Sequence, residues 1–345
     1  MPARRGSPGS FPGGSLVRSI LLLVLLALPT LAAEPVPTPA PPPKRPVHTY
    51  SIVARDPETG ELGVAVQSHW FSVGATVPWA EAGVGAVATQ SFVDPSYGKL
   101  GLELMRVGRS GPEALAGLLA ADSASQVRQV AMIDAKGQVA AHTGAKCVAA
   151  AGHIVGENFS VQANMMEKDT VWPAMAKAFR ETKGDLAERM LAALEAAEAQ
   201  GGDIRGKQSA GLIVVSGKAS GRPWMDRKFD LRVDDHPAPL KELRRLVTLQ
   251  RAYNLMNEGD LAIERNDTEG ALKAYSAAEA LVPGNAEMVF WHAVSLVNVG
   301  KVDEALPLLQ KTYKADARWK ELLKRLPKSG LLPEDPKLMN RLLGR

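Results

Sequence analysis

Between residues 49 and 235, the order of expected strands and helices narrows the fold more than any other feature. Blocks of β-prone, apolar residues alternate with pairs of helices, in the order strands, two helices, strands, two helices, strands. A doubly wound parallel sheet would instead alternate single strands with single helices, so the paired helices argue against it. The pattern favours an α+β fold in which two antiparallel sheets stack face to face with a helix pair outside each.

Turn and cap residues set the boundaries of these elements. The segments 56–60 (DPETG) and 134–137 (DAKG) each predict the turn of a hairpin. Ser110 is a suitable N-cap for a helix that has Pro112 in its first turn. Strands are expected at 49–54, 62–67, 84–89, 127–133, 139–143, 159–164, 208–215 and 228–233, and helices at 100–107, 111–121, 171–182 and 185–199.

After residue 240 the sequence is helical and contains a repeat. The segment 269–272 (EGAL) recurs as 303–306 (DEAL), 34 residues later, which is the tetratricopeptide period. Small residues occupy positions where paired helices must approach closely. The further pairs at the same offset are Gly259 with Ala293 and Tyr275 with Leu309.

We therefore expect a tetratricopeptide-like domain over residues 236–326, with repeats at 252–285 and 286–319, followed by a tail at 327–345. A concave groove on such repeats would bind a peptide or protein partner through residues 252–319. An ordinary pair of helical hairpins is the alternative, because the second copy matches the first only in part.

The first 33 residues have the order of residue types of a secretory signal peptide. Three arginines, the only charged residues before position 34, precede the apolar run 20–28, and residues 30–32 (TLA) offer a cleavage site. The run is shorter than the ~20 residues of a membrane-spanning helix. We expect cleavage, no stable membrane span afterwards, and export to the periplasm or the cell exterior; an uncleaved anchor is the alternative. Residues 34–47 contain seven prolines and predict an extended linker.

The charge and the metal-binding residue types exclude several functions. The net charge of +4 falls to about +1 without the three arginines of the signal, and no basic stripe with interleaved aromatics points to nucleic acid. The single cysteine, Cys147, cannot form an intramolecular disulfide, and we interpret it as a small buried hydrophobic residue. The six histidines are scattered, so neither a metal nor a cofactor is expected. The oligomeric state is left open.

Four segments carry a family resemblance. They are TYSIVARDPETGELGVAV at 49–66, VPWAEAGVGAVATQ at 77–90, GGDIRGKQS at 201–209 and DLRVDD at 230–235. In this order they resemble family 1028 of the domains of unknown function, over residues 49 to about 246. That family is grouped with the N-terminal-nucleophile (Ntn) hydrolases. The resemblance therefore implies a four-layer αββα sandwich over residues 48–235.

The resemblance also implies a mechanism. In Ntn hydrolases the first residue of the mature chain uses its own α-amine as the base that activates its side chain. Thr49 is the matching residue here, and a cut between His48 and Thr49 would be needed to free its amine. Residues 49–98 contain no lysine that could assist the Thr49 nucleophile. Arg55 lies in this segment, but an arginine cannot shuttle protons. The alternative is that Thr49 is simply a β-branched residue that opens a strand.

Other polar residues occupy or adjoin the family-like segments. Gln90 and Asn164, each at the end of an expected strand, would point their amides into a shared cleft as oxyanion donors; satisfied turn residues are the alternative. His69 and Asp94 follow strand ends, where loops gather at sites. With Ser209 they are candidate binding residues, and solvated or structural positions are the alternative for these three.

These observations lead to two hypotheses. The first is an exported Ntn-hydrolase-like protein that cleaves a peptide or cell-wall amide, with Thr49, Gln90 and Asn164 as catalytic residues and the repeats as a protein-binding segment. The second is a secreted, non-catalytic binding or scaffold module that uses the same sandwich and repeats.

Overall fold

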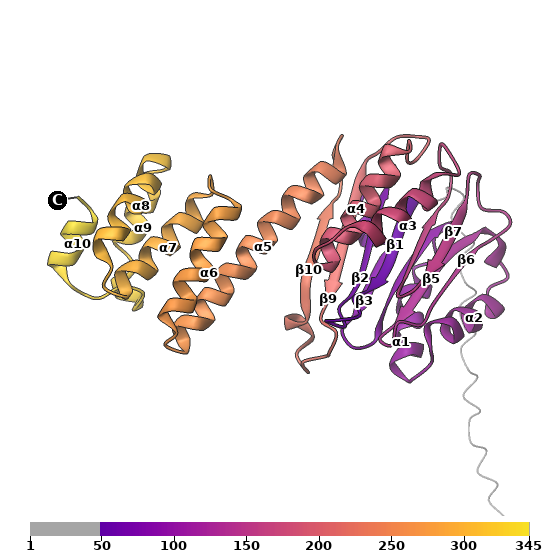
Figure 1. Ribbon diagram of the computed structural model, residues 1–345, viewed down its shortest axis with the longest axis horizontal. Coiled ribbons are helices and arrows are strands. Elements are labelled where there is room, and N and C mark those ends of the chain that lie inside the picture. Colours follow the sequence, from indigo (N-terminus) through magenta and orange to yellow (C-terminus); the bar gives the residue numbers. More distant parts are fainter. Residues whose placement is uncertain (1–48, 345) are drawn as a thin grey trace, which may run out of the picture. The chain divides into compact units, whose positions relative to one another are not determined.

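The computed structural model describes residues 49–344 and is mixed α+β (Figure 1). The described residues form ten strands, in two antiparallel sheets, and ten α-helices. This confirms the expected α+β class with two antiparallel sheets. The expected signal peptide and proline-rich linker lie outside the described residues. Between residues 49 and 344, none of the helices combines the length and apolarity needed to cross a membrane.

The larger sheet has six strands in the order β10-β9-β2-β1-β8-β7. The hairpin β1–β2 forms at its centre because Asp56 Oδ1 accepts the backbone N–H groups of Glu58 and Thr59 and closes the turn. The strands are β1 (Thr49–Arg55), β2 (Leu62–Ser68), β7 (Gly152–Gly156), β8 (Phe159–Ala163), β9 (Ser209–Val215) and β10 (Arg227–Val233).

The smaller sheet has four strands in the order β3-β4-β5-β6. Its strands are β3 (Pro78–Glu81), β4 (Gly85–Ser91), β5 (Arg128–Asp134) and β6 (Val139–Thr143). The sequence pattern did not predict β3 or β7. Both are short strands at the edge of a sheet, and they have no fully buried run of β-branched residues.

Two helix pairs accompany the sheets. Ser110 caps the second helix, as the sequence predicts, and does so through a capping box with Glu113. The carboxylate of Asp185 caps the fourth helix. The helices are α1 (Ser96–Arg106), α2 (Gly111–Ala121), α3 (Val171–Glu181) and α4 (Leu186–Ala199). The first of these begins four residues before the expected position at Leu100.

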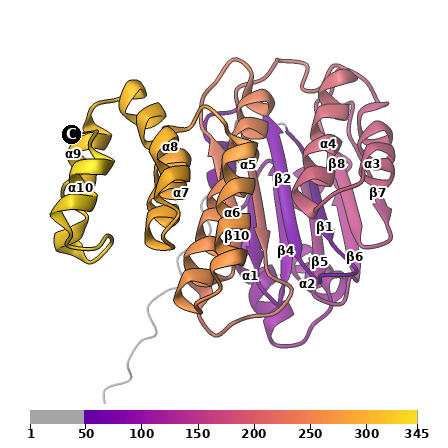
Figure 2. The ribbon, with the colours of Figure 1, turned by 60° about the vertical axis from the view of Figure 1, so that its left-hand side comes forward.

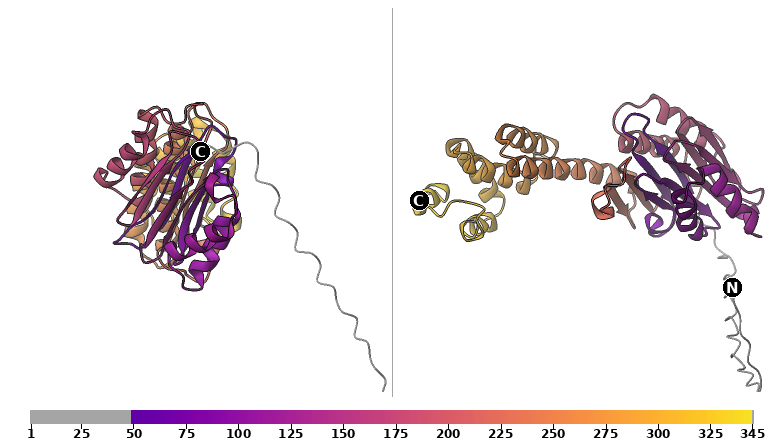
Figure 3. Two further views of the ribbon diagram at one scale, coloured as in Figure 1. Left: turned by 90° about the vertical axis from the view of Figure 1, so that its right-hand side faces the viewer. Right: turned by 90° about the horizontal axis from the view of Figure 1, so that it is seen from below.

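Three apolar cores join these elements in layers. Between the sheets, Val53 and Val64 of the larger sheet meet Ala88 and Ile133 of the smaller one. On its other face, the larger sheet packs against α3 and α4. The smaller sheet packs against α1 and α2, so that the strands lie between the two helix pairs (Figure 3, left). Alternation along each strand assigns every second residue to the core between the sheets.

The helical segment begins with one long helix. α5 (Pro239–Glu264) covers both the residues that precede the first expected repeat and the first helix of that repeat. Its first half packs Leu240, Leu243 and Val247 into the core beneath α3 and α4, and its second half packs against α6 (Figure 2). The remaining helices are α6 (Thr268–Leu281), α7 (Ala286–Asn298), α8 (Val302–Ala315), α9 (Arg318–Leu323) and α10 (Pro336–Leu342).

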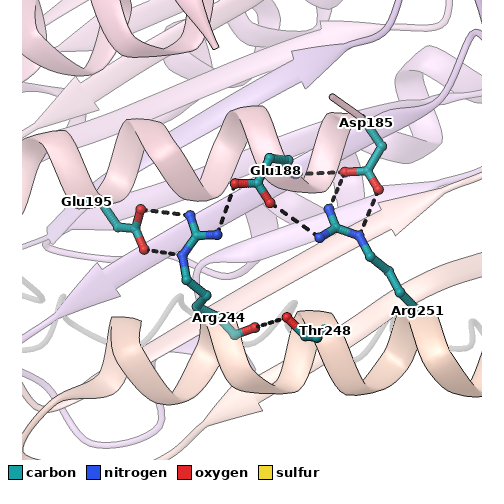
Figure 4. A network of polar contacts seen from close by, with 6 residues as sticks. All are labelled: Asp185, Glu188, Glu195, Arg244, Thr248 and Arg251. Carbon is teal, nitrogen blue, oxygen red and sulfur yellow. Dashed lines mark hydrogen bonds and ion pairs between the residues drawn. The ribbon is translucent and has the colours of Figure 1, made fainter. Parts of the chain in front are cut away.

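A network of ion pairs joins α5 to α4 (Figure 4). Arg244 binds both carboxylate oxygens of Glu195, at 2.6 and 2.8 Å, and also reaches Glu188 at 2.9 Å. About two turns further along α5, Arg251 binds Asp185 and the second oxygen of Glu188. Glu188 therefore lies between two arginines, and three carboxylates of α4 and its cap face two guanidinium groups of α5.

The residues related by the 34-residue offset lie in two packed helix contacts. Gly259 on α5 faces the ring of Tyr275 on α6 so closely that an added Cβ would lie 2.5 Å from Tyr275 Cε1. Ala293 on α7 and Leu309 on α8, one repeat later, are fully buried in one core. The expected tail contains α10, whose Leu342 joins that same core.

Candidate active site

A buried polar cluster fills one end of the space between the two sheets. β4 and β5 are apolar at their other inward positions and polar where they reach this end, whereas β1 begins with two polar inward residues and β8 has only polar ones. Burying amide groups there is unfavourable unless each one finds a hydrogen-bond partner. The inward polar residues are Thr49 and Ser51 of β1, Gln90 of β4, Gln129 of β5, and Ser160, Gln162 and Asn164 of β8 and the residue after it, all with no exposed surface.

Gln90 and Asn164 converge on the first residue of β1. Gln90 Nε2 donates to the carbonyl oxygen of Thr49 at 3.1 Å. The backbone N–H of Asn164 donates to the same oxygen at 3.1 Å, and Asn164 Nδ2 lies 3.4 Å from it. The Thr49 hydroxyl donates to Ser68 Oγ at 3.3 Å. The structure thus brings together the three expected catalytic residues, with both amides reaching the Thr49 carbonyl oxygen.

Gln129 is the hub of the cluster. Its Oε1 accepts from Gln90 Nε2 at 2.7 Å and from Asn164 Nδ2 at 2.8 Å. Its Nε2 donates to the carbonyl oxygen of Ala163 and to Thr143 Oγ1, both at 2.9 Å. One side chain therefore sets the orientation of both amides that reach Thr49.

A second branch runs through Ser51. Its hydroxyl donates to Gln90 Oε1 at 2.6 Å and accepts from Gln162 Nε2 at 2.6 Å. Gln162 Oε1 in turn accepts from Ser160 Oγ at 3.0 Å. Because every amide atom in this branch is bonded, the cluster is held as a single unit.

The cluster extends from Gln129 to a half-buried histidine. Thr143 Oγ1, which accepts from Gln129, lies 2.8 Å from His153 Nδ1. Burial lowers the pKa of His153, and the neighbouring His142 lowers it further. His153 is therefore neutral at pH 7 and can accept the Thr143 proton.

Sequence analysis missed Ser51, Gln129, Gln162, Thr143 and His153 as members of this cluster. Each occupies an inward position of a strand, and its alternation with apolar residues on the opposite face or with apolar inward neighbours was the available signal. This signal identifies a buried polar side chain but not its hydrogen-bond partner. The partner lies on another strand, and the tertiary structure determines which strands come together.

The expected binding residues make contacts outside this cluster. Ser209 is fully buried, donates to the carbonyl oxygen of Trp70 and accepts from the backbone N–H of Val73 at 3.0 Å, which holds the loop after β2. The exposed His69 donates its backbone N–H to Asp203 Oδ2 at 3.1 Å.

Asp94 sits at the start of α1 and likewise has a local role. Its Oδ1 accepts from the backbone N–H of Ser96 at 3.0 Å, and its second carboxylate oxygen lies 3.5 Å from the Arg128 guanidinium. Arg128 is also paired with Asp122 at 2.8 Å. These contacts join the first turn of α1 to β5.

The surroundings of Cys147 disfavour a nucleophilic role for its thiol. The Cys147 thiol is half-buried, donates to the carbonyl oxygen of Arg128 at 3.3 Å, and has its pKa raised by burial, which disfavours the nucleophilic thiolate. In the part of the chain that the structure describes, no three His, Cys, Asp or Glu side chains gather as metal ligands would.

The segments that carry the cluster also define the family. A model of the "Family of unknown function (DUF1028)" matches residues 49–243, more than half of the chain. The chain belongs to the DUF1028 family. The match begins at Thr49, the first residue of the cluster, and ends inside α5, so the first turn of that helix is included with the DUF1028 domain.

A solved structure agrees with this assignment. The crystal structure of protein SPO2555 from Silicibacter pomeroyi, described as DUF1028, is 31% identical, with a TM-score of 0.52 over 58% of this chain and 88% of that one. No curated protein matches the chain. The helices after α5 lie outside the DUF1028 match.

Proposed function

We propose that this DUF1028 protein is an exported amide hydrolase of the N-terminal-nucleophile type, with Thr49 as the nucleophile. The observation that carries the proposal is the convergence of Gln90 and Asn164, from opposite sheets, on the first residue of β1. The succession of α3 and α4, two sheets, then α1 and α2 supports reading the DUF1028 domain as the αββα sandwich of that superfamily. The 34-residue offset likewise supports reading α5 to α8 as tetratricopeptide-like repeats that bind a partner.

The proposed reaction begins with a cut between His48 and Thr49, which frees the Thr49 α-amine. That amine takes the proton of Oγ1 as the oxygen bonds to the carbonyl carbon of a peptide or cell-wall amide. The C–N bond then breaks, the proton leaves with the amine product, and water hydrolyses the remaining ester.

The cluster would stabilise the oxyanion of this reaction. Asn164 Nδ2 is held by Gln129 at 2.8 Å but reaches the Thr49 carbonyl only at 3.4 Å. The longer hydrogen bond is the weaker one, so its N–H is the donor most easily redirected to a developing oxyanion. Gln90, bonded at 2.7 Å to Gln129 and at 3.1 Å to Thr49, would hold the nucleophilic residue in place.

The N-terminus of the mature protein tests the proposal. The full-length chain is expressed in a host that exports it, and the product is examined by intact mass and N-terminal sequencing. A species beginning at Thr49 is expected. A product that begins near Glu34, with none at Thr49, would contradict the free-amine mechanism.

Activity is then tested on a panel of acyl p-nitroanilides. Replacing Thr49 by Val removes the hydroxyl at constant shape and should lower turnover by about a thousandfold or more, whereas Thr49→Ser should retain measurable turnover. Thr268→Val, at the exposed start of α6, is the matched control and should not change turnover.

A second candidate function has its own supporting observation. Thr49, Gln90 and Asn164 have no exposed surface, and the amides of Gln90 and Asn164 are hydrogen-bonded within the protein. Such a cluster suits a non-catalytic scaffold that presents the helical segment to a partner. An uncut chain that binds a partner but turns over no amide would favour this candidate.

A further inference from the structure

A groove of about 470 Å³ lies between α5 and α7. The lining residues recur every three or four positions on each helix, so each helix presents one continuous stripe to the groove. Met256, Ile263 and Val294 give it apolar walls. Its polar and aromatic lining includes Tyr253, Asp260, Tyr275, Glu287, Trp291 and Ser295.

Two carboxylates in the groove are each held by a tyrosine. Tyr275 donates its hydroxyl proton to Asp260 Oδ1 at 2.7 Å, and Tyr253 donates to Glu287 Oε2. The hydrogen bond to Glu287, with burial, raises the pKa of Tyr253 to about 12. Both tyrosines therefore stay protonated and neutral, so they orient the carboxylates without neutralising them.

The groove has no positive charge of its own. None of the residues that line it is Lys, Arg or His. Across residues 49–344, neither Asp260 nor Glu287 forms an ion pair within the chain. Two negative charges thus face a pocket walled by aromatic and apolar side chains, where a cation would be attracted more strongly than at an open surface.

Ser295 is an independent sign of a missing partner. Only 4% of its surface is exposed, it lines the groove, and its Oγ has no hydrogen-bond partner. Burial and Asp260 raise the pKa of Tyr275, and the nearby Ser295 hydroxyl opposes that rise, although the two hydroxyl groups do not meet the geometry of a hydrogen bond. A buried hydroxyl without a partner is unfavourable, and a polar group of a bound ligand would satisfy it.

We propose that this groove binds a peptide segment of a partner protein through an arginine side chain. The guanidinium lies between Asp260 and Glu287 and over the aromatic ring of Trp291, and apolar neighbours in the peptide contact Met256 and Val294. A planar guanidinium both binds carboxylates and stacks on aromatic rings, which the compact ammonium of lysine does less well. An acidic peptide would bring like charges together in the same pocket.

The proposal concerns the helical segment alone, so it holds or fails independently of hydrolysis at Thr49. The probe is an acetylated, amidated pentapeptide of alternating leucine and arginine. Matched peptides carry citrulline, which has the shape of arginine without its charge, or glutamate. Binding to the full-length chain is measured by calorimetry and by fluorescence.

Saturable binding of the arginine peptide is expected, with at least tenfold weaker binding of the citrulline and glutamate peptides. Asp260→Asn and Glu287→Gln each remove one charge while keeping an acceptor for the tyrosine, and each should weaken binding about fivefold. Glu258→Gln makes the same charge change on an exposed part of α5 that does not line the groove, and should leave affinity unchanged.

Three results would overturn the proposal. They are equal affinity for the citrulline peptide, tighter binding of the glutamate peptide, and equal losses in Glu258→Gln and Glu287→Gln. Circular dichroism shows whether Asp260→Asn is folded. If it is not, comparing the affinities of the arginine and citrulline peptides for the unaltered chain still tests the proposal.

Discussion

The side-chain amide of Gln90 donates a 3.1 Å hydrogen bond to the carbonyl oxygen of Thr49, across the space between the two sheets. This bond ties the smaller sheet to the first residue of the larger one. It also shows that the amide is directed at the backbone of Thr49, so the position of the threonine is fixed through its carbonyl group. This geometry is compatible with Thr49 as a positioned nucleophile and with a purely structural polar core. Determining the N-terminal residue of the mature chain distinguishes these two interpretations.

Replacing Gln129 by Leu should destabilise the protein by about 2–4 kcal/mol, because the amides of Gln90 and Asn164 lose a shared acceptor in a buried site. Urea unfolding followed by circular dichroism measures the change. Gln138→Leu, at an exposed hairpin position, is the control and should change stability by less than about 0.5 kcal/mol. Equal effects of the two variants would argue against Gln129 as the hub.

His153 should make stability depend on pH below neutrality. Its pKa is lower in the folded protein than in the unfolded chain, because it is half-buried and lies near His142. As the pH falls below the unfolded value of about 6.5, the unfolded chain therefore binds a proton that the folded protein does not, and stability decreases. The loss is complete once the pH passes below the lowered folded pKa.

His153→Asn keeps a polar group for Thr143 but does not titrate. Urea midpoints measured from pH 8 to pH 5 should fall less steeply in this variant than in the unaltered protein. The value at pH 8, where the histidine is neutral in both states, serves as the reference for each protein. Parallel curves would show that His153 does not control the slope.

Arg244→Met should weaken the attachment of α5 to α4 while keeping the apolar stem of the side chain. Arg244 binds Glu195 in a bidentate pair, but 40% of its side chain is exposed, so we expect a loss of only about 1 kcal/mol that diminishes at high salt. A double-mutant cycle with Glu195→Gln isolates the pair. Arg245→Met, whose partner Glu242 lies on the same helix, should have no effect on the attachment.

Gly259→Ala tests the close approach of α5 and α6. Alanine gains up to about 1 kcal/mol in helix propensity, but its Cβ would lie 2.5 Å from Tyr275 Cε1, and overpacking costs about 1–3 kcal/mol. A lower thermal midpoint is expected. Gly117→Ala is the control, because Gly117 lies in α2 with open space at the Cβ position, and it should be neutral or stabilising. An increase in both midpoints would exclude the predicted clash.

The sequence predicted the elements whose signals are local. Ser110 and Pro112 mark the start of α2, the turn at 56–60 closes the first hairpin, and α3 and α4 were expected at 171–182 and 185–199. It missed β3 and β7, since short edge strands bury too few residues to show a period. It also missed α10, whose helix is stabilised by packing of Leu342 into a core built by α7 and α8.

For the site, the sequence by itself identified Thr49 through the family resemblance, and Gln90 and Asn164 as polar residues at the ends of expected strands. Only the tertiary structure decided that all three meet, that Gln129 joins two of them, and that His69, Asp94 and Ser209 hold loops elsewhere. The physical reason is the distance along the sequence over which each interaction acts. Caps, turns and periodicity act within a few residues, whereas a buried amide is satisfied by whichever strand the packing of two sheets brings opposite it.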